Sequence, residues 1–328
     1  MPKVSVCIPT YNRAELLSYA VESTLKQTYT DLELIICDDG STDNTPERVL
    51  QWNDPRIRYI RHPQNIGRSR NMRSGFEAAT GEYFIKFDDD DALATEFLEK
   101  TVAILENDST LDFVCTNHWI IDRQSQRIES ATRENSEKWG KDKLQKGFIS
   151  DLLTETFVYQ SLQVGSTLFR RQALADVDYM RAQADGCEDF DLFVRLALAG
   201  KQGYFLPEFL MEYRIHSGQT SLKQDIHFLK AKQFCLNSYQ FSDANLENIR
   251  IGKLGAIQQT LGLRSIEQGN TAEGRKLLQE SDRLLGRSRK SQMGRFLSYL
   301  PLSLRRLAFQ FFRQWRPQTY SDRVRDII

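Results

Sequence analysis

The sequence predicts an α/β protein built on a Rossmann-like sheet, mixed but mostly parallel and flanked by helices, with a C-terminal helical extension. In the first third of the 328 residues, short apolar runs alternate with segments of helical periodicity, which is typical of βαβ units. Beyond about residue 220 the pattern is almost purely helical. The length, about twice that of a typical domain, allows one large α/β domain with an appendage.

The apolar runs in the first 122 residues have the length and composition of buried strands. They span residues 3–11, 31–41, 57–62, 81–91 and 111–122. Helices are expected between them, over residues 13–27, 41–52, 67–80 and 94–107. In the first helix, Leu17, Val21 and Leu25 recur at helical spacing. In the second, Pro46 follows polar capping residues, as at a helix start.

The middle of the chain is less regular. Residues 124–150 are polar and show no clean period, so we expect a loop or lid there. Strand and helix patterns resume over residues 165–174, 187–201 and 203–216.

Composition argues against several classes of protein. Basic and acidic residues number 44 each, so the zero net charge gives no indication of a nucleic-acid-binding protein. The five cysteines are odd in number and scattered, which indicates neither a disulfide framework nor a zinc site. No signal peptide precedes the first strand, and no apolar run approaches the ~20 residues needed to cross a bilayer. We therefore expect a cytoplasmic protein.

The C-terminal end is basic and contains a predicted amphipathic helix. From Arg287 onward there are ten basic residues and two acidic ones. In the helix, over residues 301–316, Leu304, Leu307, Ala308, Phe311, Phe312 and Trp315 share one side, and Arg305, Arg306, Gln310, Arg313 and Gln314 the other. Such a helix suits peripheral contact with an anionic membrane. The alternative is a helix packed on the protein's own core.

Polar residues follow the first two strands, at the sheet edge where ligands of open parallel sheets bind. The first strand leads into Pro9, Thr10, Tyr11, Asn12 and Arg13. This segment offers backbone groups, a ring and a cation, which suit a nucleotide base and a diphosphate. At the second strand end, a carboxylate of Asp38 or Asp39 can accept a hydrogen bond from uracil or ribose. The alternative there is an Asp-Gly turn leading into a capped helix.

Four consecutive aspartates, Asp88 to Asp91, end the fourth strand. Carboxylates this close raise one another's pKa. Mg²⁺ or Mn²⁺, which bridge carboxylates to substrate phosphates, would offset the repulsion. If the strand continues to its last aspartate, alternation puts Asp88 and Asp90 on one side and Asp89 and Asp91 on the other. Asp91 is expected to cap the helix that begins near Ala94, and a plain acidic turn is the alternative for the whole run.

The helix over residues 187–201 begins with an acidic pair, Glu188 and Asp189. Leu192, Phe193 and Leu196 form an apolar stripe that would anchor this helix. A carboxylate held at the mouth of a site can remove a proton from an attacking hydroxyl. The alternative is an acidic first turn that complements the helix dipole.

Together these segments resemble the inverting family-2 glycosyltransferases of the GT-A fold. The similar segments are residues 4–13, 27–45, 65–91 and 188–201, in the family's order and spacing. The resemblance covers about residues 3–220 and implies the GT-A nucleotide-diphospho-sugar transferase fold over residues 1–220. Nucleotide-sugar binding would fall to residues 1–115, the acceptor side to residues 116–220, and the helical region to residues 221–328.

The resemblance also implies roles for single residues. Asp39 would contact the donor's base, and Asp88, Asp89 and Asp90 would form the DxD-type motif. Within it, Asp90 would bind the metal directly, Asp88 would act through water, and Asp89 would contact the donor ribose. Asp189 would be the base.

Three further roles follow from the resemblance. Glu188 would orient the base or bind the acceptor. Arg68 would contact the donor diphosphate, although Met72-Arg73 stand where the family commonly has Arg-Asn, and a solvated basic helix face is the alternative. His216 lies in a segment similar to the part of the family that folds over the diphosphate, and it would bind metal or phosphate unless it is structural.

The implied function is a metal-dependent transfer of a sugar, with Mn²⁺ or Mg²⁺ as the metal. The donor would be a UDP-sugar or a related nucleotide sugar. The acceptor would be a glycan or lipid-linked glycan in cell-surface polysaccharide synthesis. A non-catalytic nucleotide-sugar-binding or scaffold protein of the same fold is the alternative, but it would have no use for Asp189. A nucleotidyltransferase would need a glycine-rich phosphate loop after the first strand. The chain has Pro9-Thr10-Tyr11-Asn12 there.

Overall fold

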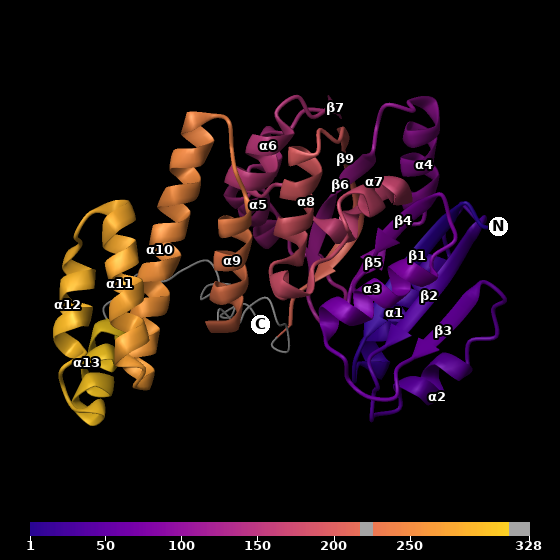
Figure 1. Ribbon diagram of the computed structural model, residues 1–328. Coiled ribbons are helices and arrows are strands. Elements are labelled where there is room, and N and C mark those ends of the chain that lie inside the picture. The colour runs from indigo at the N-terminus through magenta and orange to yellow at the C-terminus, as the bar shows by residue number, and fades with distance from the viewer. Residues whose placement is uncertain (217–225, 315–328) are drawn as a thin grey trace. The chain divides into compact units, whose positions relative to one another are not determined.

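The computed structural model describes residues 1–216 and 226–314, and its chain forms two compact units (Figure 1). Unit 1 comprises Met1–Ala182 and Glu188–Ser217, and unit 2 comprises Gln183–Cys187 and Gly218–Ile328. The α/β pattern falls in unit 1 and the helical pattern in unit 2.

A nine-stranded mixed sheet is the centre of unit 1. Its strands are β1 (Val4–Thr10), β2 (Leu32–Asp38), β3 (Ile57–Arg61), β4 (Tyr83–Lys86), β5 (Ala92–Leu93), β6 (Phe113–Ile121), β7 (Gly147–Phe148), β8 (Thr167–Arg170) and β9 (Gly203–Arg214). Their order is β3-β2-β1-β4-β8-β6-β9-β5, and β7 pairs with β9. β1 to β4 are mutually parallel, whereas β8 is antiparallel to both of its neighbours.

Helices cover both faces of this sheet. They are α1 (Ala14–Leu25), α2 (Thr45–Leu50), α3 (Arg68–Ala78), α4 (Phe97–Asn107), α5 (Glu129–Lys138), α6 (Leu152–Thr154), α7 (Arg171–Asp176) and α8 (Glu188–Leu198). Strand alternation sorts the core between the faces. In β4, Tyr83 and Ile85 pack with α1 and α4, whereas Phe84 packs with α3, α7 and α8. This division decides which helix each residue of β4 faces.

The polar segment 124–150 is not the loop that its composition predicts. It contains α5, a 3₁₀ turn over Lys141–Lys143, and β7. The buried residues of α5 are Ala131 and Thr132, and the Thr132 hydroxyl accepts a hydrogen bond from the Ile120 N–H (2.9 Å). Because α5 buries only these two small residues, its sequence has no apolar stripe from which a helical period could be detected.

Unit 2 is helical, as its pattern predicts. Its helices are α9 (Ile226–Ser238), α10 (Ala244–Gln268), α11 (Thr271–Leu285), α12 (Arg289–Leu297) and α13 (Leu302–Gln314). None of the helices within residues 1–216 and 226–314 is long and apolar enough to cross a membrane. The five cysteines are buried and free, which confirms that no disulfide framework exists.

The side on which helix α13 packs within unit 2 differs from the predicted division of this helix into an apolar and a basic face. Arg305 is buried and donates hydrogen bonds to the carbonyl oxygens of Ile266 (2.8 Å) and Leu300 (2.7 Å). Phe309 packs in the core of the unit. Arg305 is therefore not on a solvated basic face, because its side chain is buried and hydrogen-bonded to the backbone of its own unit. Trp315 and the end of the predicted helix lie outside the described residues.

Glycine at position 75 lets α3 lie close against the sheet. A Cβ there would meet the sulfurs of Cys7 (2.1 Å) on β1 and Cys37 (2.8 Å) on β2. We expect Gly75→Ala to destabilise the protein by roughly 1–3 kcal/mol through overpacking, despite the helix propensity of alanine. Urea unfolding measures this, with Gly252→Ala in α10 as the control, because nothing lies within 4 Å of the added methyl there. A Gly75→Ala protein as stable as wild type would show that the close approach is not required.

Candidate active site

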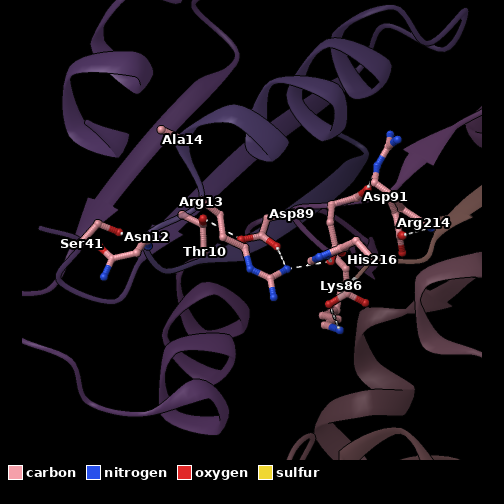
Figure 2. A network of polar contacts seen from close by, with 12 residues as sticks. Thr10, Asn12, Arg13, Ala14, Ser41, Lys86, Asp89, Asp91, Arg214 and His216 are labelled. Carbon is pink, nitrogen blue, oxygen red and sulfur yellow. Dashed lines mark hydrogen bonds and ion pairs between the residues drawn. The ribbon is translucent and has the colours of Figure 1, made fainter. Parts of the chain in front are cut away.

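Most of the predicted donor-site residues lie at the carboxyl ends of β1, β2 and β4, where the strand order reverses. From β1 the chain moves to one side through β2 and β3, and β4 returns to the other side of β1. Ligands of open parallel sheets bind at such a switch point. Figure 2 shows the polar contacts that join the loops there.

Asn12 ties the loop after β1 to the loop after β2. Its backbone is left-handed (φ 53°), a conformation that asparagine adopts more readily than most residues. Its side-chain oxygen accepts hydrogen bonds from the N–H groups of Thr42 (2.7 Å) and Asp43 (3.3 Å), and its own N–H donates to Ser41 Oγ (2.9 Å). Asn12 therefore positions the loop, while the neighbouring Tyr11 ring, 43% exposed, remains accessible to a ligand.

Arg13 bridges two of the four aspartates, and Figure 2 shows its contact with Asp89. Its Nη1 lies 3.1 Å from Asp89 Oδ1 and 2.7 Å from Asp90 Oδ2. Thr10, which follows Pro9 at the end of β1, donates its hydroxyl to the other oxygen of Asp89 (2.7 Å). The structure thus brings together Thr10, Arg13 and both aspartates.

His216 contacts Asp90 from beyond the end of β9. Its Nε2 lies 2.9 Å from Asp90 Oδ2, the oxygen that also accepts from Arg13. Burial opposes ionisation of Asp90, but the hydrogen bond from His216 and the charge of Arg13 hold the pKa of Asp90 below its ordinary value. The two residues predicted to bind metal therefore lie side by side.

Asp91 is buried and faces Arg214 on β9. Its Oδ1 accepts a hydrogen bond from the Arg214 N–H (2.9 Å), and its Oδ2 has no hydrogen-bond partner among the described residues. Burial and the charges of Asp90 and Asp88 raise the pKa of Asp91 well above its ordinary value. The prediction that Asp91 caps the next helix is wrong, because β5 follows it and α4 begins only at Phe97.

Asp88 pairs with a cation that the sequence analysis overlooked. Lys86, the last residue of β4, is buried, and its Nζ lies 2.6 Å from Asp88 Oδ1. The carboxylate of Asp88 remains 37% exposed.

The predicted alternation of the four aspartates fails, because β4 ends at Lys86. The chain then turns, with the Asp91 N–H donating to the Asp88 carbonyl oxygen (3.4 Å). Asp89 and Asp90 consequently share one cation, although alternation assigns them to opposite faces. Burial and the charge of Asp90 raise the pKa of Asp89 to about 7, against the opposing charge of Arg13.

The doubled aspartate after β2 holds two turns. Asp38 accepts hydrogen bonds from the Ser41 N–H (2.8 Å) and the Tyr59 hydroxyl (2.6 Å). Asp39 accepts from the N–H groups of Ile66 (2.7 Å) and Gly67 (3.1 Å), which precede α3. Both carboxylates are buried, so each has a structural task in addition to any contact that Asp39 makes with a donor.

Glu188 joins the first turns of α3 and α8. Its carboxylate, which is buried, receives two hydrogen bonds from Arg68 (3.2 and 2.9 Å) and one from the Ser69 hydroxyl (2.9 Å). Its orienting role is consistent with these contacts, and Arg68 is held at the site rather than on a solvated helix face.

Asp189 follows Glu188 on α8 and is half-buried. Burial raises the pKa of Asp189 above its ordinary value, and the charge of Asp88 adds to this. Lys86, Arg68 and the backbone of Val164 oppose the rise. The predicted base therefore shares its electrostatic environment with the aspartate run, and a raised pKa suits a group that must accept a proton near neutral pH.

The donor atoms present fit a divalent cation that completes its shell with substrate oxygens. Asp90 offers a carboxylate oxygen and His216 an imidazole nitrogen, ligands that Mn²⁺ accepts. Among residues 1–216 and 226–314 no three His, Cys, Asp or Glu side chains are grouped to hold an ion. Mg²⁺ and Mn²⁺ with nucleotides commonly use one or two protein ligands and the phosphates.

Comparison with known proteins supports this fold. Over 254 residues the chain is 29% identical to the chondroitin synthase of Pasteurella multocida (strain Pm70), covering 75% of this chain but only 24% of that protein's length.

Two solved structures are also similar. The S. aureus TarS fragment 1–349 in complex with UDP-GlcNAc covers 98% of this chain and 95% of its own, with a TM-score of 0.64 and 14% identity. The mannosyltransferase PcManGT from Pyrobaculum calidifontis, in complex with GDP-Man and Mn²⁺, covers 97% and 88%, with a TM-score of 0.56 and 16% identity. These likenesses confirm the fold class.

A family model described as Glycosyl transferase family 2 matches residues 5–177, more than half of the chain. The match includes the loops after β1, β2 and β4, whose contacts build the site. The resemblance noted in the sequence is thereby confirmed. This chain is a member of glycosyl transferase family 2.

Proposed function

We propose that this chain transfers a sugar from a nucleotide donor to a hydroxyl of a glycan or lipid-linked glycan, with inversion at the sugar. The observation that carries the proposal is the meeting at one sheet edge of the cation-held aspartates with Asp189, a half-buried carboxylate of raised pKa. Membership of the family supports the reaction class. The chondroitin synthase and the UDP-GlcNAc complex of TarS support polysaccharide synthesis and a UDP-sugar donor.

The loop after β1 and the aspartate run would bind the donor. Tyr11 presents an accessible ring for the base, and Asp39 closes the same edge on the side of β2. Asp89 would contact the ribose, and Arg13 and Arg68 would contact the diphosphate. This arrangement leaves the exposed side of Asp88 free to face the donor.

Asp189 would remove the proton from the acceptor hydroxyl as that oxygen attacks the anomeric carbon. Attack from the face opposite the nucleotide breaks the bond to the diphosphate in a single displacement and inverts the configuration. Glu188 holds Arg68 and Ser69 and so fixes the start of the helix that carries the base. The helix then presents Asp189 at its first turn.

Asp90 and His216 would hold a Mn²⁺ or Mg²⁺ ion, whose charge stabilises a diphosphate leaving group. The Mn²⁺ in the PcManGT complex supports this part of the proposal. Arg13 already contacts the same Asp90 oxygen and would lie beside the diphosphate.

We also propose that α13 contacts an anionic membrane from the cytoplasmic side. Leu304, Leu307 and Phe311 are exposed along one face of the helix, with exposed fractions of 53%, 61% and 57%. Arg306 beside them is exposed as well. An apolar face with adjacent cations suits the interface of an anionic bilayer, where a lipid-linked acceptor would be found.

Asp189→Asn is expected to lower transfer by on the order of 10²–10⁴ while donor binding is kept, because the base is lost but the carboxylate's volume is not. In the wild type, transfer falls as the pH drops through the raised pKa of Asp189, so its acidic limb lies above the ordinary aspartate value of about 3.9. Nucleotide release from a panel of UDP- and GDP-sugars measures both, with the exposed Asp142→Asn as the control. Full turnover by Asp189→Asn would remove Asp189 as the base.

Removal of metal with EDTA should stop transfer, and Mn²⁺ should restore it. Asp90→Asn should lower the restored rate by on the order of 10² because the direct ligand is lost. The matched control is the adjacent Asp91→Asn, because the hydrogen bond of Asp91 goes to the backbone of Arg214 and not to Arg13 or His216. Undiminished transfer by Asp90→Asn in the presence of EDTA would contradict the metal role.

Replacement of the exposed residues of α13 by serine (Leu304→Ser, Leu307→Ser and Phe311→Ser together) should reduce binding to phosphatidylserine vesicles in a sedimentation assay. The melting temperature should remain close to that of wild type, because these side chains are exposed while Arg305 and Phe309 make the docking contacts. Leu50→Ser is the control, since Leu50 is a still more exposed leucine in unit 1. Unchanged vesicle binding by the triple variant would rule out the membrane contact.

A further inference from the structure

Lys86 is a buried cation that the mechanism above does not use. It belongs to β4, where Phe84 packs with α3 and α8 on one face of the sheet. Residues two apart on a strand point to the same face, so Lys86 points toward the side of α3 and α8. The first turns of these helices carry Arg68 and Asp189. Strand alternation thus places a cation on the side of the sheet that carries the predicted base.

The electrostatics agree with this placement. Although burial opposes the charge of Lys86, Asp88 and Asp189 hold its pKa above the ordinary value. A buried ammonium is costly unless it is paired, and Nζ lies 2.6 Å from Asp88 Oδ1. Asp88 is the partner that fixes its position.

We propose that Lys86 is a positioning residue for the transfer reaction, because its buried ammonium, fixed by Asp88 on the side of the sheet that carries α8, favours the ionised form of Asp189 at the start of that helix. The inference rests on the proposed function, in which Asp189 is the base. It also connects that base to a residue on the donor side, since Asp88 fixes the cation that acts on Asp189.

Other charged groups also face Asp189. Asp88 comes from the turn after β4, Arg68 from α3, and Glu188 from the preceding position on α8. Tyr179, whose pKa is raised by burial and by charges that include Asp189, is a further titratable neighbour. Of the two cations, Lys86 lowers the pKa of Asp189 more than Arg68 does.

The test is the titration of Asp189 by ¹³C NMR in protein labelled at the aspartate carboxyl carbons, with the signal assigned by its loss in Asp189→Asn. Lys86→Met should raise the midpoint by on the order of one pH unit, and Lys86→Arg should keep it near wild type. Asp88→Asn should lower the midpoint, because it removes a negative neighbour. The acidic limb of the pH profile for transfer should move with the midpoint in each variant.

Lys141→Met is the matched control. Lys141 is equally buried but lies in the 3₁₀ turn after α5, with Nζ 2.9 Å from His118 Nδ1. Its removal should leave the Asp189 midpoint unchanged. If Lys86→Met does not fold, the Asp189 midpoints of Lys86→Arg and Asp88→Asn still agree with the inference or contradict it.

The outcomes separate the two proposals. An Asp189 midpoint that is the same in wild type, Lys86→Met and Asp88→Asn overturns the inference about Lys86 and leaves the proposed function intact. Full transfer by Asp189→Asn overturns the proposed base, whatever the midpoints do. A midpoint that moves while the acidic limb does not would show that Lys86 acts on the charge of Asp189 without a role in transfer.

Discussion

The site depends on the pairing of consecutive carboxylates with cations that come from different parts of the chain. Lys86 neutralises Asp88 from the strand that precedes it, and Arg13 neutralises Asp89 and Asp90 from the loop after β1. Without Arg13, Asp89 and Asp90 could not be buried side by side at a sheet edge, because an unpaired charge in the interior is strongly unfavourable. The protein's own cations therefore offset much of the repulsion within the aspartate run before any ligand binds.

The same pairing holds the loops in register. Arg13 and Thr10 connect the end of β1 to the turn after β4, and Glu188 connects α3 to α8. Each connection joins elements that are distant in sequence but adjacent at the switch point of the sheet. A change in any one of these polar groups would leave a buried partner unsatisfied, which costs more than the net value of the hydrogen bond itself.

Much of this fold could be predicted from the sequence, because βαβ periodicity is a local signal. Position in the sequence and the family resemblance predicted the strand ends, helix α8 and the convergence of Asp90 with His216. How the four aspartates divide between their partners could not be predicted, since this required knowing that β4 ends at Lys86. Helix α5 was missed because it buries only alanine and threonine. Lys86 could have been noticed as a lysine inside the apolar run of a predicted buried strand, where a charge needs a partner.

The left-handed turn at Asn12 affects how a ligand would bind. Its side-chain oxygen and its backbone N–H join the loops after β1 and β2 through hydrogen bonds, so the two loops form one rigid rim before anything occupies the edge. The conformational entropy of ordering these loops is then lost during folding and not on binding. A preorganised rim of this kind raises affinity without any added contact to the ligand.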